Sequence, residues 1–85
     1  STMVALSPAI RELRFLLPQT ASSLKSFVLN AYPSIKQQHP HLPVLIRECQ
    51  GIQPTVVVRL EKGVEVKKHV ANFSDAELKS FLQNP

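Results

Sequence analysis

The chain has 85 residues, the size of one small domain, and 44% of them are hydrophobic. This hydrophobic content excludes a disordered chain, and the longest apolar runs, such as residues 54–58, are far shorter than the roughly 20 residues that span a bilayer. The net charge of +4 suits an acidic partner, but the 10 Lys and Arg residues are dispersed, which argues against nucleic acid. The single cysteine excludes an intramolecular disulfide and favours a reducing compartment.

The first expected elements are a strand and a helix. Apolar side chains alternate along residues 11–17, and Leu16 adds one on the other side, a pattern typical of an interior strand that is covered on both faces. Apolar residues then recur every three or four positions in residues 24–35, which predicts an amphipathic helix. Pro33 lies inside this helix, so we expect a kink or a restart there. The hydroxyl groups that could cap the helix belong to Thr20, Ser22 and Ser23.

Three further strands and a second helix follow. Residues 43–49 and 54–60 are apolar runs of strand length. A short turn closed by a glycine comes next, and residues 64–70 then alternate valine with charged side chains, as expected of a half-exposed edge strand. Ser74 and Glu77 have the spacing of a capping box, so the last helix is predicted to begin there.

The order strand, helix, three strands, helix predicts an α/β fold with one mixed sheet. The first helix is a crossover, so the first two strands should be parallel, and the last two should form an antiparallel hairpin. The link between the second and third strands reaches about 15 Å when extended, which allows direct pairing or a skip over one strand. These residues therefore leave the sheet order open. We divide the chain into an N-terminal extension, residues 1–9, and one domain, residues 10–85.

The second half of the chain resembles the core of thioredoxin. The resemblance rests on Pro54 directly before the third strand, on the Lys–Gly turn and on the capped last helix. It implies a four-stranded sheet with the order 2-1-3-4 and a cis peptide bond at Pro54; the alternative is that Pro54 is the ordinary opening residue of a strand. Thioredoxins carry two cysteines between the first strand and the first helix. Residues 17–23 contain none, so we expect no dithiol exchange and no catalytic residue.

Nearly the whole chain also resembles the small thioredoxin-fold accessory subunits of the matrix arm of mitochondrial respiratory complex I, a family that shares its domain with some mitochondrial ribosomal proteins. Pro18 stands where some members have a second cysteine, and Pro33 stands where a helix-compatible residue is usual. The matching residues follow the family pattern in order: Pro40, Leu42, Pro43, Leu45, Ile46, Arg47, Glu48, Cys49, Gln53 and Pro54.

This second resemblance implies a non-catalytic subunit of mitochondrial NADH:ubiquinone oxidoreductase. Such a subunit lies on the matrix side of the inner membrane as a peripheral component. It docks on the core iron–sulfur subunit of the peripheral arm and supports assembly or stability. It has no cofactor, no small-molecule substrate and no inserted segment, and nucleic acid is not its expected partner.

Four charged residues are candidates for contact with a partner. Arg47 and Glu48 end the second strand, where they either dock on a neighbour or form an ion pair with each other. Lys67 and Lys68 lie on the outer strand, where they either hold a partner or keep the sheet edge from aggregating. Cys49 is either a redox sensor or a packed, inert thiol, and the second is expected.

Two other classes of function remain as alternatives. A mitochondrial ribosomal protein of the same domain usually carries dense basic extensions for RNA phosphates, which this chain lacks. A redox enzyme would depend on Cys49 alone, at the end of the second strand and away from the start of the first helix. A metal site is not expected, because no pair of possible ligands has a known spacing among His39, His41, Cys49 and His69.

Overall fold

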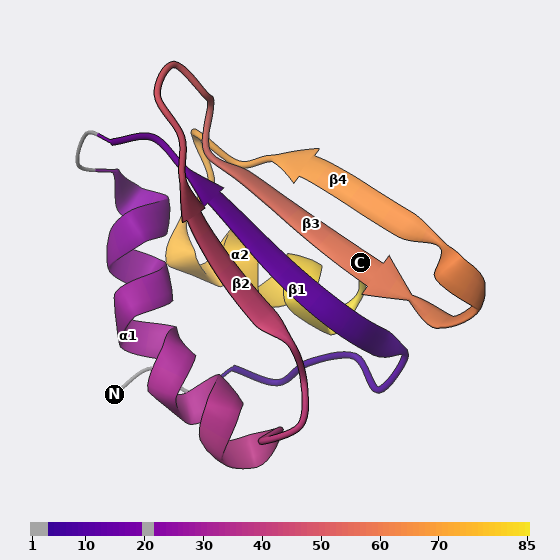
Figure 1. The fold of residues 1–85 in the computed structure, drawn as a ribbon. Coiled ribbons are helices and arrows are strands. Elements are labelled where there is room, and N and C mark those ends of the chain that lie inside the picture. The colour runs from indigo at the N-terminus through magenta and orange to yellow at the C-terminus, as the bar shows by residue number, and fades with distance from the viewer. Residues whose placement is uncertain (1–3, 20–21) are drawn as a thin grey trace.

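The computed structural model describes residues 4–19 and 22–85. Its elements, in chain order, are β1 (Ile10–Leu17), α1 (Ser23–Gln38), β2 (Val44–Glu48), β3 (Thr55–Leu60), the 3₁₀ turn Glu61–Gly63, β4 (Glu65–His69) and α2 (Asp75–Gln83). The described strands form a sheet with the order β2-β1-β3-β4 (Figure 1). β1 is parallel to β2 and antiparallel to β3, and β3 is antiparallel to β4. The predicted α/β fold, its mixed sheet and the order 2-1-3-4 are therefore confirmed.

The loop of residues 49–54 carries the chain from β2 past β1 to β3, so β2 and β3 are not neighbours in the sheet. Gly51 in this loop has a φ of +75°, a conformation that costs little only for glycine. Gly63 has the same φ at the turn between β3 and β4, as its place in the sequence predicted. β1 consequently lies in the centre of the sheet, with its parallel partner on one side and the hairpin on the other.

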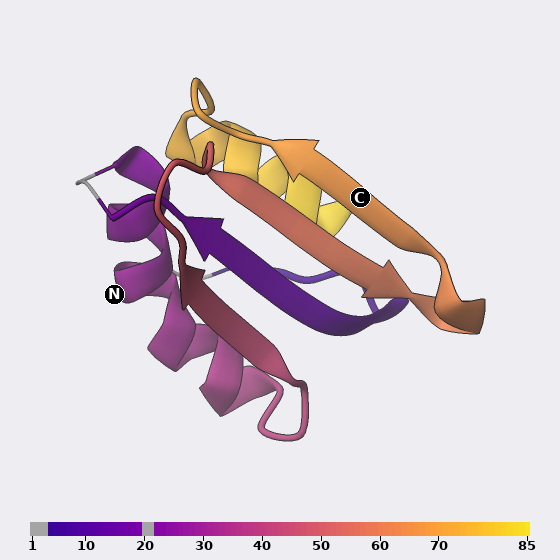
Figure 2. The same cartoon turned by 45° about the horizontal axis from the view of Figure 1, so that its top comes forward.

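Both helices lie on one face of the sheet, behind it in Figures 1 and 2. The core lies between this face and the helices, and β1 contributes Leu13, Phe15 and Leu17 to it. Leu16 points to the other face and is only partly buried. The expectation that β1 is covered on both faces is therefore wrong. Its apolar pattern is typical of a strand covered on both faces, but both helices lie on the same face of the sheet.

The segment before β1 also packs on the core. Val4 is only 2% exposed and belongs to the same cluster of buried side chains as the strands. The backbone N–H of Ser7 donates a hydrogen bond to the carbonyl oxygen of Leu82 in α2, at 3.0 Å. Sequence analysis missed this contribution because one valine outside a periodic run gives no signal. A boundary between residues 9 and 10 stays a prediction.

α1 begins at Ser22, whose hydroxyl oxygen accepts a hydrogen bond from the N–H of Lys25 at 3.1 Å. Of the other two proposed caps, Ser23 is the first residue of the helix and Thr20 lies outside the described residues. The helix continues through Pro33 without the restart that was one of our two expectations. Leu29, whose carbonyl loses its usual partner, and Pro33 are both exposed, so water can reach this side of the helix.

In the described parts of the chain, no helix combines the length and apolar character needed to cross a membrane.

The expected cis bond at Pro54 is wrong, since all peptide bonds of residues 4–19 and 22–85 are trans. Pro54 instead lies in a trans linkage directly before β3, whose first residue is Thr55. The carbonyl oxygen of Pro54 accepts a hydrogen bond from the N–H of Val70 at 2.9 Å, which continues the pairing of β3 with β4. The trans form of an X–Pro bond is favoured by about 0.5–1 kcal/mol, and the loop of residues 49–54 reaches β3 without a cis bond.

The predicted capping box at the start of α2 is confirmed. The N–H of Glu77 donates to the hydroxyl oxygen of Ser74 at 3.2 Å, and the N–H of Ser74 donates to the Glu77 carboxylate at 3.0 Å. We expect Ser74→Ala to lower the free energy of unfolding by about 1 kcal/mol, because an N–H at the helix end loses its partner. Urea denaturation would measure this loss. Ser80→Ala, an exposed change within α2, is the control, and equal losses in both variants would contradict the capping role.

Candidate functional site

The candidate site is the face of the sheet that neither helix covers, which we call the open face. Successive side chains of a strand point to opposite faces, so the strand register determines which residues share this face. Rows of neighbouring residues cross the sheet from β2 to β4. The first row contains Glu12, Arg59 and Glu65; the second contains Leu45, Arg14, Val57 and Lys67; the third contains Arg47, Leu16, Thr55 and His69.

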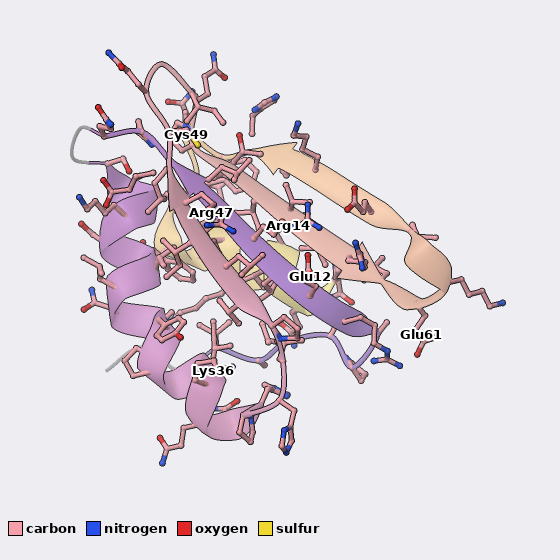
Figure 3. The ribbon with its side chains drawn as sticks, viewed as in Figure 1. Glu12, Arg14, Lys36, Arg47, Cys49 and Glu61 are labelled. Atoms are coloured by element: carbon pink, nitrogen blue, oxygen red, sulfur yellow. The ribbon has the colours of Figure 1, made fainter. Side chains whose placement is uncertain are left out.

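Arg14, on the central strand, binds both carboxylates of the open face. Its Nε donates to Oε2 of Glu12, and its terminal guanidinium nitrogen lies 3.8 Å from Oε1 of Glu65 on β4. Figure 3 shows Arg14 and Glu12 together over the near side of β1. The contact with Glu12 is partly buried, whereas Glu65 is exposed and its contact is long. Both acidic groups of the open face are therefore already in contact with Arg14.

Three other cations of the open face have no hydrogen-bond or ion-pair partner among the residues that the structure describes. They are Arg47, Arg59 and Lys67, and all three are exposed. Arg59 lies between Glu12 and Glu65 in its row, so acidic neighbours offset its charge. Arg47 and Lys67 stand in the second and third rows, which contain no carboxylate. The second and third rows of the open face therefore carry one unpaired cation at each edge of the sheet, Arg47 on β2 and Lys67 on β4.

Apolar side chains share the rows of these two unpaired cations: Leu45 and Val57 lie in the row of Lys67, on either side of Arg14, and Leu16 lies next to Arg47. Leu16 is partly buried and Leu45 is 36% exposed, whereas Val57 keeps only 7% of its surface exposed. Figure 3 shows Arg47 on the near side of β2. We call the group of Leu16, Leu45, Arg47, Val57 and Lys67 the platform. A partner with apolar side chains at its centre and carboxylates at its margins would match the platform in chemistry.

The structure separates the four residues that the sequence proposed for docking. Arg47 and Lys67 lie on the open face, while Glu48 and Lys68 point to the opposite side. Arg47 and Glu48 cannot pair with each other, because neighbours on a strand point to opposite faces. Glu48 instead lies 3.9 Å from the ammonium group of Lys25 in α1. The alternative of an Arg47–Glu48 ion pair is therefore wrong.

Sequence analysis missed Arg14 and Arg59 as members of the same surface. Arg59 is the one charged residue of its strand and Arg14 is one of three in its own, so each indicates only the polar side of that strand. Their common face follows only from the pairing of β1 with β3, where Glu12 lies opposite Arg59. The alternation of charge and leucine in residues 12–16 was the available signal, but its partners on other strands were unknown.

His69 is held in one orientation by Thr55, which is buried next to it on β3. The Thr55 hydroxyl donates to the carbonyl oxygen of Gln53 at 2.8 Å and lies 3.1 Å from Nδ1 of His69. Within residues 4–19 and 22–85, no three His, Cys, Asp or Glu side chains come together as metal ligands.

Cys49 is partly buried at the end of β2, beyond Arg47 in Figure 3. Its N–H donates to the carbonyl oxygen of Leu17 at 2.8 Å, so the residue that follows β1 lies beside it. That residue is Pro18, which has no thiol. Since Cys49 is also the one cysteine of the sequence, a dithiol cannot form within the chain.

Comparison with known proteins places this arrangement among respiratory and ribosomal proteins. Residues 24–75 match the family model described as the Mitochondrial ribosomal protein L51 / S25 / CI-B8 domain. The chain is 34% identical over 83 residues to NADH dehydrogenase (ubiquinone) 1 alpha subcomplex subunit 2 of Arabidopsis thaliana, covering 94% of this chain and 86% of that protein. It is 35% identical over 83 residues to the NADH-ubiquinone oxidoreductase 10.5 kDa subunit of Neurospora crassa, with coverages of 94% and 88%. The mouse alpha subcomplex subunit 2 is 33% identical over 87 residues, with coverages of 99% and 88%.

Proposed function

Because this chain belongs to the family of NADH dehydrogenase (ubiquinone) 1 alpha subcomplex subunit 2, we propose that it is an accessory subunit of mitochondrial NADH:ubiquinone oxidoreductase, respiratory complex I. It lies in the peripheral arm on the matrix side of the inner membrane. It docks on the core iron–sulfur subunit and supports assembly or stability of the complex. The observation that carries the proposal is a similarity to subunits of this enzyme over at least 94% of the chain.

A non-catalytic role is supported by the chemical groups that the chain offers. Thiol–disulfide exchange needs a thiolate to attack and a second thiol to resolve the mixed disulfide. Cys49 can supply only the first of these, and Pro18 stands beside it. The charged groups of the open face are spread over four strands. They suit contact with another protein surface.

Blue-native electrophoresis of solubilised mitochondria tests the proposed function directly. The chain should migrate in the band that carries NADH dehydrogenase activity, and its deletion should reduce the amount of that band. Free migration of the chain, with an unchanged activity band after deletion, would contradict the proposal.

A second candidate function is supported by the family model itself, whose description also names mitochondrial ribosomal proteins. A ribosomal role requires contacts with RNA phosphates, which Lys and Arg side chains normally supply in clusters. On the described surface, the unpaired Arg47 and Lys67 stand at opposite edges of the sheet. Co-sedimentation with ribosomes through a sucrose gradient would favour this candidate over the first.

The thiol of Cys49 should be dispensable in either case. We expect Cys49→Ser to reach the activity band as efficiently as the unaltered chain, because serine nearly preserves the size of the side chain and the backbone bond to Leu17. We also expect the purified chain to show no reduction of insulin disulfides. Turnover of a disulfide substrate that is lost in Cys49→Ser would contradict a non-catalytic role.

A further inference from the structure

We propose that the platform on the open face is the docking surface, and that its partner is an acidic amphipathic helix lying across the strands. This inference rests on the proposed function and adds the face of the domain and the chemistry of the partner. The platform consists of Leu16, Leu45, Arg47, Val57 and Lys67, as defined above.

The charge of the open face selects an acidic partner. Arg14 already contacts Glu12 and Glu65, so the acidic groups of the face are engaged within the chain. Arg47 and Lys67 have no ion-pair partner in the described parts of the chain, and their rows contain no carboxylate. Complementary charge on a partner would pair both cations and guide its approach.

The dimensions of the sheet suit a helix. Arg47 on β2 and Lys67 on β4 are three strand spacings apart, about 14 Å, and lie in neighbouring rows, about 7 Å apart along the strands, so their positions on the sheet are about 16 Å apart. An α-helix advances 1.5 Å per residue, so acidic residues ten or eleven positions apart would meet both cations. The apolar residues of the same helix would then cover Leu16, Leu45 and Val57. Such contact would remove apolar surface of the platform from water.

The aromatic residues of the chain argue against single-stranded RNA on this face. Proteins that bind RNA on a sheet stack the bases on aromatic side chains. The chain has four Phe and one Tyr, and none of them lies in the three rows of the open face. They lie in the core face of β1, in α1, or in and next to α2. The apolar residues of the second and third rows are instead aliphatic: Leu16, Leu45 and Val57.

A second exposed apolar group lies on α1 and fits an acidic partner less well. It consists of Leu29, Tyr32 and Pro33, which share one side of the helix by their spacing. The lysines of α1 are already engaged. Lys25 faces Glu48 at 3.9 Å, and Lys36 donates to the carbonyl oxygens of residues 40 and 42. Of these two apolar groups, the platform is therefore the one that has unpaired cations beside it.

Two adjacent lysines give a matched test of the docking face. Lys67 and Lys68 are both exposed on β4, but Lys67 points to the open face and Lys68 to the other side. In mitochondria that lack the native chain, we expect Lys67→Glu to lower incorporation into the complex I band about tenfold or more, since it places a carboxylate against an acidic partner. Lys68→Glu should change incorporation less than twofold. Circular dichroism of both purified variants would establish that they fold.

Zero-length carbodiimide crosslinking of the assembled complex tests the chemistry of the partner, because this reagent joins lysines to carboxylates in direct contact. We expect Lys67 to form crosslinks to Asp or Glu of another subunit, and Lys68 to form none. Equal effects of the two reversals, or crosslinks from Lys68 alone, would overturn the inference while leaving the proposed function intact. Absence of the unaltered chain from the complex I band would overturn the proposed function. If the chain instead migrates with ribosomes and is released by ribonuclease, the inference of a protein helix also fails.

Discussion

Leu13→Ala is expected to lower the free energy of unfolding by about 2–5 kcal/mol, the range for a buried leucine whose removal leaves a cavity. Leu13 is 0% exposed on the central strand and packs in the cluster that joins the sheet to both helices. Small domains are stable by about 5–15 kcal/mol, so this single change removes a large part of that stability. Urea denaturation of the purified chain at 25 °C would measure the loss.

Leu16→Ala is the matched control for this prediction. The same atoms are removed from the same strand, but Leu16 points to the open face and is only partly buried. Water can fill the space that it leaves, so we expect a loss of about 1 kcal/mol or less. Equal losses in the two variants would contradict the assignment of the two faces of β1.

Leu16→Asp is expected to abolish incorporation into the complex while the isolated domain still folds. In the free chain, the new carboxylate would lie in water next to Arg47, its row neighbour on β2, so the cost to folding should be about 1 kcal/mol. In the docked chain, the same carboxylate would be buried against an acidic, apolar partner. An unpaired buried charge at an interface costs about 2–5 kcal/mol, enough to displace the chain from the complex.

Leu29→Asp provides the comparison for that result, because it introduces the same charge on the outer side of α1. Leu29 is 65% exposed, so the change should cost the fold no more than the helix propensity of Asp, about 0.7 kcal/mol. If the platform is the docking surface, Leu29→Asp should enter the complex normally. Loss of incorporation in Leu29→Asp, with Leu16→Asp unaffected, would assign docking to α1. Blue-native electrophoresis and circular dichroism would be applied to both variants.

The two prolines that the sequence singled out illustrate how local preference can be overridden. Pro33 was expected to kink or restart α1, and the restart is wrong, because α1 is continuous from Ser23 to Gln38. Its opposite side is fixed in the core by buried residues such as Phe27 and Ile35, and this packing exceeds the cost of one lost hydrogen bond. Pro54 was expected to be cis by resemblance to thioredoxin, and it is trans. Resemblance of the surrounding sequence did not determine the isomer.

The sequence by itself determined the number, type and order of the elements, because each depends on local signals. Alternating apolar residues marked β1, the period of three to four marked α1, and the Ser74–Glu77 pair marked the start of α2. The family could likewise be identified from the sequence, because residues 39–54 follow the family pattern without a gap.

Only the tertiary structure decided which strands are neighbours and which face of the sheet lies open. The loop of residues 49–54 was long enough for either sheet order, so its sequence could not choose between them. The apolar Leu16 was compatible with a central strand covered on one face and with one covered on both faces. Once β1 lies between β2 and β3 with both helices on one side, Arg47 and Lys67 share the uncovered face, and Glu48 and Lys68 turn away from it. Strand pairing joins residues distant in sequence, and a local pattern contains no information about that distance.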